Sequence, residues 1–111
     1  MSLWTRFLRP LRRNRLLLEL ADAVAERHAR PLAERIFERV EAMPIAELRG
    51  YVRAVGAIAV HDQVASLARQ HRLPAARLDR LERMAVAALI PQTVRAISRI
   101  SEDRPVARRA A

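Results

Sequence analysis

Apolar residues recur at intervals of three and four along most of the chain, which is the spacing of one face of an α-helix. Prolines divide this pattern, because proline is tolerated at the first position of a helix but disrupts its interior. We therefore expect five helical segments, of which the second and third form one kinked helix in an alternative interpretation. They cover approximately residues 2–9, 11–29, 31–40, 44–71 and 74–100, the last with a break or kink at Pro91.

Two stretches within the last two segments are apolar on every side, residues 54–60 and residues 84–90. A helix that is apolar all round is buried in the middle of a protein. We expect these stretches to face each other, so that helices 44–71 and 75–100 form a long antiparallel pair. The small residues around Gly56 would let a neighbouring helix approach closely, although glycine costs about 1 kcal/mol relative to alanine in a helix interior.

Composition favours the same fold class. The chain of 111 residues has only two glycines and 4% aromatic residues, whereas a sheet protein needs turn glycines and many aromatic or β-branched strand residues. Alanine, leucine, arginine and glutamate, which are good helix formers, dominate instead. We predict one all-α domain: a small helical bundle of four to five helices around the long antiparallel pair, with no sheet.

The ends of the chain differ in charge from its middle. The net charge is +9, and all 21 basic residues are arginine. Residues 16–48 carry seven acidic residues and four arginines, so the positive charge lies toward the two ends. We divide the chain into a short basic amphipathic helix or arm (1–13), the helical bundle (14–100) and a basic tail (101–111) without periodicity, which we expect to be disordered.

The excess of positive charge indicates an anionic partner, which could be a nucleic acid, an acidic protein surface or an anionic membrane. Guanidinium groups bind phosphate through paired hydrogen bonds. Such contacts give affinity without reading sequence, and they weaken steeply with salt. No helix-turn-helix is recognisable and Tyr51 is the single tyrosine, so base stacking on aromatic side chains is not expected. The candidate residues on helix faces are Arg49, Arg53, Arg69, Arg72, Arg77, Arg80, Arg83, Arg95 and Arg99.

The N-terminal segment is the most distinctive part of the sequence. Its apolar residues include Trp4 and Phe7, and arginines surround them, which is the pattern of a helix that lies on an anionic membrane. Pro10 limits this helix to about two turns, which weakens membrane binding. The segment caps the bundle core, docks on a protein or nucleic acid, or binds a membrane. The candidate docking residues are Trp4, Arg6, Phe7, Arg9, Arg12 and Arg13.

Motifs of catalysis and cofactor binding are missing. The sequence has no glycine-rich phosphate loop, no GxSxG, no HExxH and no EF-hand loop. Without cysteine, no disulfide and no thiolate metal site can form. We interpret His28, His61 and His71 as core or surface residues, because His61 and His71 lie nearly three helical turns apart, too far to share one metal ion. We expect no enzymatic activity, no cofactor and no metal.

The leading hypothesis is a non-enzymatic helical subunit whose arginine-rich surfaces brace an anionic partner, chiefly the phosphate backbone of RNA or DNA within a larger assembly. One alternative is a protein–protein adaptor or assembly subunit, homo- or hetero-oligomeric, without nucleic-acid contact. Another is a peripheral membrane protein docked by its N-terminal helix. No apolar run reaches the roughly 20 residues of a membrane span, and acidic residues interrupt the only candidate for a secretory signal. We expect a cytoplasmic location, peripheral to a membrane in the last alternative.

Overall fold

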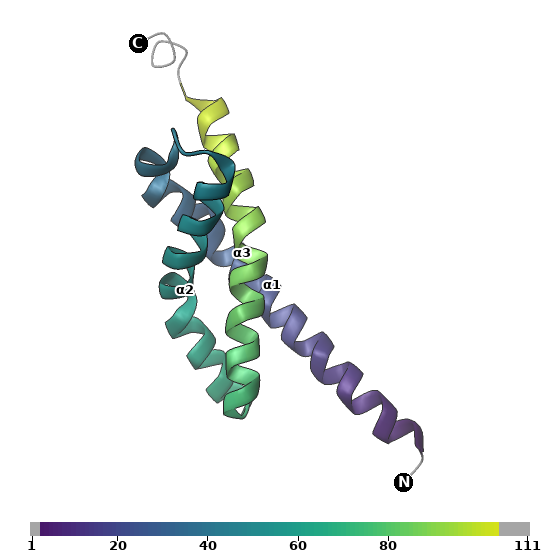
Figure 1. The fold of residues 1–111 in the computed structure, drawn as a ribbon. Coiled ribbons are helices and arrows are strands. Elements are labelled where there is room, and N and C mark those ends of the chain that lie inside the picture. The colour runs from purple at the N-terminus through teal and green to yellow at the C-terminus, as the bar shows by residue number, and fades with distance from the viewer. Residues whose placement is uncertain (1–2, 105–111) are drawn as a thin grey trace.

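A computed structural model describes the backbone of residues 3–104 and, within it, the side chains of residues 12–104. This part of the chain forms three α-helices and contains no strand (Figure 1). They are α1 (Leu3–Val40), α2 (Ile45–Gln70) and α3 (Ala75–Asp103). The expected all-α class is confirmed, whereas the expected number of four to five helices is wrong.

The number is lower because the three segments expected at residues 2–9, 11–29 and 31–40 form the single helix α1. Both α1 and α3 continue through their prolines. Pro10 and Pro31 lie within α1, and Pro91 lies within α3. A proline in a helix leaves the carbonyl four residues earlier without its hydrogen bond. For Pro31 and Pro91 these carbonyls belong to Arg27 and Ala87, which are exposed residues, so water can replace the lost bond.

The chain runs up along α1, down along α2 and up again along α3, so that α2 and α3 form the expected antiparallel pair (Figure 1). The helix α3 packs against both others, and its contact with α1 is the more extensive. The first part of α1 extends beyond the other two helices. The molecule is therefore elongated, with extents of 69 × 23 × 22 Å and a radius of gyration of 17.5 Å, against about 13 Å for a compact domain of this size.

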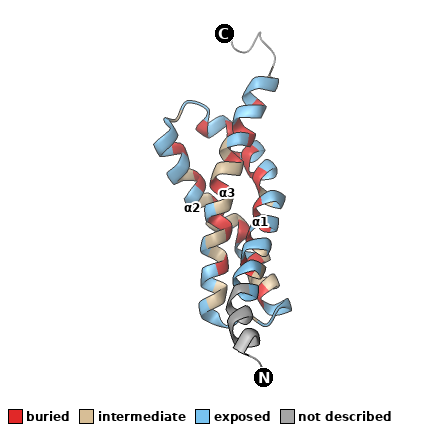
Figure 2. Ribbon diagram, turned by 90° about the vertical axis from the view of Figure 1, so that its right-hand side faces the viewer, coloured by how far each residue is buried: buried red, intermediate tan, exposed pale blue. Residues whose placement is uncertain are grey.

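One core runs along the inner faces of the helices (Figure 2). In α2 every fourth residue is buried: Leu48, Val52, Gly56, Val60, Val64 and Ala68. The three helices meet at Gly56, where a Cβ atom would lie 2.7 Å from Cδ2 of Leu89 and 4.0 Å from Cδ2 of Leu32. Gly56 therefore gives the close helix crossing that its small neighbours indicated.

The apolar stretch 54–60 of α2 is covered on one side only. Ile58 is 80% exposed and Ala54 is exposed as well, whereas Val60 is completely buried. The expectation that this stretch is buried all round is wrong, because α1 and α3 both pack on the same side of α2 and no described element covers the other.

The helix α3 ends later than expected. Residues 101–103, which we assigned to a disordered tail, form its last turn. Arg104 follows, with its guanidinium 4.1 Å from the centre of the Phe37 ring and Nη1 donating a hydrogen bond of 2.9 Å to Oε1 of Glu38. These contacts hold the end of α3 against α1. Residues 105–111 lie outside the described part of the chain.

Candidate functional site

Eight of the nine candidate arginines are exposed and Arg77 is half-buried. None of the nine forms an ion pair with a carboxylate within the part of the chain that the structure describes. The ion pairs there have N–O distances of 2.9 Å and join Arg30 to Glu34, His61 to Glu82 and Arg104 to Glu38. The positive charge of the nine guanidinium groups is therefore open to an anionic partner.

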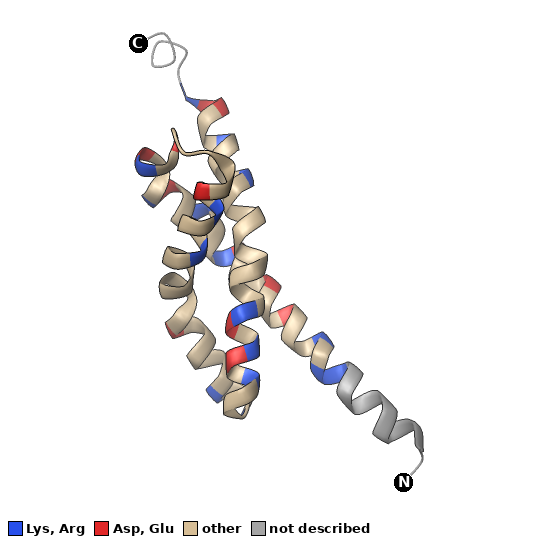
Figure 3. Cartoon of the chain, viewed as in Figure 1, with Lys and Arg blue, Asp and Glu red and all other residues tan. Residues whose placement is uncertain are grey.

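The structure separates these arginines into three groups. Basic residues are accordingly spread over all three helices instead of gathering on one face (Figure 3). Arg95 and Arg99 line a groove between α1 and α3. Arg53 and Arg83 line a second groove, between α2 and α3, and Arg49 precedes Arg53 by one turn. The other four lie at the end of the α2–α3 hairpin, around the turn that joins the two helices: Arg69, Arg72, Arg77 and Arg80.

The α1–α3 groove has a volume of about 400 Å3 and polar walls. Its α3 wall presents Arg95 and Arg99 at adjacent turns, together with Gln92; its α1 wall presents Arg30 and Glu26. Ala29 and Ala96, both nearly buried, lie between the walls and let the two helices approach closely. Three guanidinium groups thus converge on one groove whose walls hold a single carboxylate.

Sequence spacing found only part of this groove. The interval of four residues predicts that Arg95 and Arg99 share a face of one helix. It cannot show that Arg30 and Gln92 join them, because the register between α1 and α3 is set by packing. Arg30 donates a hydrogen bond of 2.9 Å from Nε to Glu34 one turn later, so its charge is partly compensated, unlike that of Arg95 and Arg99.

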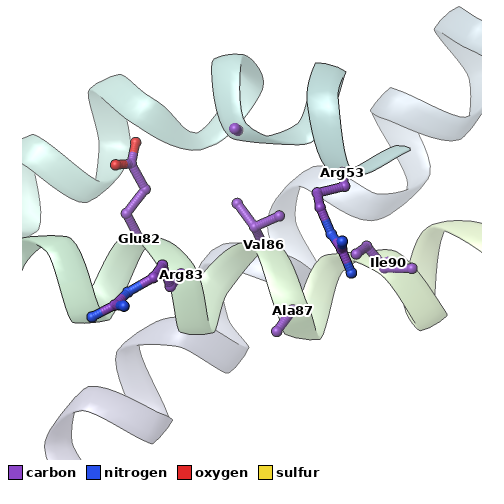
Figure 4. A pocket seen from close by; sticks show the side chains of 7 residues that line it. Arg53, Glu82, Arg83, Val86, Ala87 and Ile90 are labelled. Carbon is purple, nitrogen blue, oxygen red and sulfur yellow. The ribbon is translucent and has the colours of Figure 1, made fainter. Parts of the chain in front are cut away.

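The α2–α3 groove is of similar size, about 430 Å3, but mainly apolar. Its floor is formed by Ala57, Val86, Ala87 and Ile90. Arg53 reaches from α2 toward Ile90, and Glu82 reaches from α3 toward α2 at the other end (Figure 4). An apolar floor with charged residues at its margins suits a partner's side chains better than a phosphate group.

Two histidines make hydrogen bonds between helices that the sequence did not predict. Nδ1 of His61 donates to Oε1 of Glu82 at 2.9 Å, and Nε2 of His28 donates to Oε1 of Gln63 at 2.6 Å. The hydrogen bond to Glu82 raises the pKa of His61 above its ordinary 6.5, and the negative charges of Glu82 and Asp62 raise it further. No cluster of three or more His, Asp or Glu side chains suited to a metal ion occurs among the described residues.

Arg72 has a structural role at the hairpin end. Its φ angle of 52° is in the left-handed region. Its N–H donates to the carbonyl of Arg69 at 3.2 Å, and the N–H of Leu73 donates to the carbonyl of Ala68 at 2.8 Å. This pair of bonds is the Schellman motif that closes the C-terminus of a helix. The motif turns the chain into α3 and projects Arg72 into solvent.

The docking segment lies at the projecting end of α1. Arg12 and Arg13 are exposed there, whereas Trp4, Arg6, Phe7 and Arg9 lie outside the residues whose side chains are described. Its role therefore stays a prediction. No helix in the described range is both long enough and apolar enough to span a membrane.

Comparisons with protein families, with curated proteins and with solved structures find no match to this chain.

Proposed function

We propose that the chain is a non-enzymatic helical subunit that braces the phosphate backbone of RNA or DNA within a larger assembly, and that the α1–α3 groove is its main contact. The observation that supports this proposal is the pair of unpaired guanidinium groups, Arg95 and Arg99, on adjacent turns of a polar groove. Arg30 and the amide of Gln92 complete a set of donors. Guanidinium forks bind phosphate oxygens in pairs, and such contacts are indifferent to base sequence.

The proposal is tested by the salt dependence of binding to a labelled single-stranded oligonucleotide, followed by fluorescence anisotropy. Each phosphate contact contributes about 0.7 to the slope of log K against log salt for a single strand. The double variant Arg95→Gln/Arg99→Gln should therefore reduce this slope by about 1.4. The matched control is Arg35→Gln/Arg39→Gln, which removes the same charge from an exposed pair at the same spacing on α1.

An equal loss of slope in both double variants would show that net charge, and not the groove, determines binding. Binding that does not weaken with salt, or no binding at low salt, would contradict the phosphate contact altogether.

A second candidate is an assembly subunit that contacts protein and no nucleic acid, which the apolar floor of the α2–α3 groove favours. Ala87 is an exposed part of that floor, so Ala87→Glu should prevent assembly with a partner and leave oligonucleotide binding almost unchanged. In either case we propose a cytoplasmic location; in the membrane alternative, the N-terminal helix makes the contact to the membrane.

A further inference from the structure

The outer face of α2, turned away from α1 and α3, carries an uncovered row of apolar residues beside the exposed carboxylate of Asp62. Ile58 at its centre is 80% exposed, compared with 57% for Ile45 and 54% for Leu18, the other exposed large apolar residues of the described chain. A helix at the side of a bundle needs one apolar face, and in α2 the residues in register with Gly56 already provide it. Packing within one chain therefore does not explain the apolar residues on the outer face of α2.

The residues of this outer face have the spacing of a helix-packing seam. Tyr51, Ala54, Ile58, His61 and Ala65 follow one another at intervals of three and four residues, and each is exposed or half-buried. His61 is the polar member of this row and pairs with Glu82 of α3. Intervals of three and four that add to seven are the heptad pattern with which a helix packs on a second helix. The outer face of α2 therefore suits a second helix better than a flat surface.

The face is self-complementary about Ile58. When two copies of one helix pack antiparallel around a twofold axis, residues at equal distances before and after the central residue face each other. Tyr51 and Ala65 each lie seven residues from Ile58, which places a large side chain opposite a small one. Glu47 and Arg69 each lie eleven residues from it and have opposite charges. Seven and eleven residues are close to two and three full turns, so all five lie on one face.

We propose that α2 is a self-association helix, against which the α2 of a second copy of this chain packs antiparallel with Ile58 on the twofold axis. A twofold interface must be complementary to itself, and this face is complementary in size where Tyr51 meets Ala65 and in charge where Glu47 meets Arg69. Neither Glu47 nor Arg69 has an ion-pair partner among the described residues, so both are available to the second copy. The interface leaves the α1–α3 groove open and is independent of the proposed phosphate contact.

Sedimentation equilibrium of the full chain tests this proposal. We expect a reversible monomer–dimer equilibrium, and we expect Ile58→Asp to weaken the dimer at least about tenfold, because it buries a charge at the centre of the interface. Ile45→Asp is the matched control, since Ile45 is also exposed on α2 but lies off the seam. A chain that is monomeric at every concentration, or an Ile45→Asp effect as large as that of Ile58→Asp, would overturn the proposal.

Charge exchange tests the register. Glu47→Arg alone places two arginines opposite each other, and Arg69→Glu alone places two glutamates opposite each other, so each should weaken the dimer. The double variant Glu47→Arg/Arg69→Glu should restore it. Both residues lie in terminal turns of α2, where the helix dipole favours their present charges, so each reversal also destabilises the helix. A melting curve followed by circular dichroism therefore checks that each variant is folded. Failure of the double variant to restore the dimer would overturn the antiparallel register.

Cysteine cross-linking tests the orientation, because the natural chain has no cysteine. Ile58→Cys should form a disulfide with itself across the twofold axis. Ala54→Cys should not, because Ala54 faces Asp62 of the second copy, but a mixture of Ala54→Cys and Asp62→Cys chains should cross-link. Disulfides require Cα atoms within about 7 Å, so self-cross-linking of Ala54→Cys would indicate a parallel pair and overturn the proposal.

Discussion

Gly56 shows, at the scale of single residues, how closely the three helices approach. The leucines that surround it, Leu32 and Leu89, are 2% and 0% exposed, so neither can turn its side chain toward solvent. Gly50 lies six residues earlier in the same helix, and no atom lies within 4 Å of a Cβ placed there. Alanine substitution at Gly50 therefore measures only the helix propensity of glycine, whereas the same substitution at Gly56 also measures the lack of space for a methyl group.

We expect Gly50→Ala to raise the free energy of unfolding by about 1 kcal/mol, the difference in helix propensity. Gly56→Ala gains the same propensity but overpacks a buried position, which costs about 1–3 kcal/mol. Urea denaturation should therefore find Gly56→Ala less stable than Gly50→Ala by about 1–3 kcal/mol. Equal stabilities would mean that Leu89 moves aside freely and would contradict a tight crossing.

The ion pair between His61 and Glu82 makes stability depend on pH. Because the folded pKa of His61 lies above its unfolded value, the pair contributes fully below about pH 6.5 and is lost as the pH rises through the folded pKa. The free energy of unfolding should exceed that of Glu82→Gln by more at pH 5.5 than at pH 8.5. A difference between the two proteins that is constant over this range would contradict the pair.

Residue chemistry was predictable from the sequence along a helix but not between helices. The spacing of Arg95 and Arg99 predicted that they lie on one face of a helix, since this depends only on helical periodicity. The contribution of Arg30 to the same groove, and the pairing of His61 with Glu82, depend on how α3 is placed against its neighbours. That placement follows from the packing of the whole core, which no single stretch of sequence encodes.

At the scale of elements, spacing and proline predicted helices and their starts better than their ends. The starts of α2 and α3, directly after Pro44 and Pro74, are as expected. Pro31 was interpreted as a helix boundary, with one kinked helix as the alternative, and Pro91 as a break or kink, because an interior proline costs about 3 kcal/mol. The local rule omits the burial of Leu32 and Ile90 beside them, which offsets that cost only if the helix continues.

The end of α2 offers a test at this scale. Arg72 adopts the left-handed conformation that glycine usually occupies at this position of a Schellman motif. Arg72→Gly should raise the free energy of unfolding by about 0.5–1 kcal/mol, because relief of steric strain exceeds the added entropy of the unfolded chain. Arg72→Ala removes the same charge but keeps the strain, so in thermal melts it should resemble the natural protein. Equal gains in both variants would assign the effect to charge.

For the molecule as a whole, the sequence predicted the amount of positive charge and its position along the chain, but not its distribution over the folded surface. Packing places Arg95 and Arg99 on one side of α3 and Arg53 and Arg83 on the other. It also leaves Ile58, on the outer face of α2, open to contact. The charge is thus spread around a body only 22–23 Å across its two short axes, so like charges on opposite sides still interact at low ionic strength.

This arrangement predicts that salt stabilises the fold. A chain with a net charge of +9 is destabilised by its own repulsion. The three ion pairs between described residues each have at least one largely exposed partner, so they oppose that repulsion only weakly. The Debye length falls from about 30 Å at 0.01 M salt to about 8 Å at 0.15 M, so the repulsion is screened over that range. The melting temperature of the Ile58→Asp variant, in which the proposed dimer is weakened, should therefore rise with sodium chloride at low protein concentration. The rise should be smaller when Arg69 and Arg80 are also replaced by glutamine, because less repulsion remains to be screened. A melting temperature that falls with salt would show that the ion pairs outweigh the net charge.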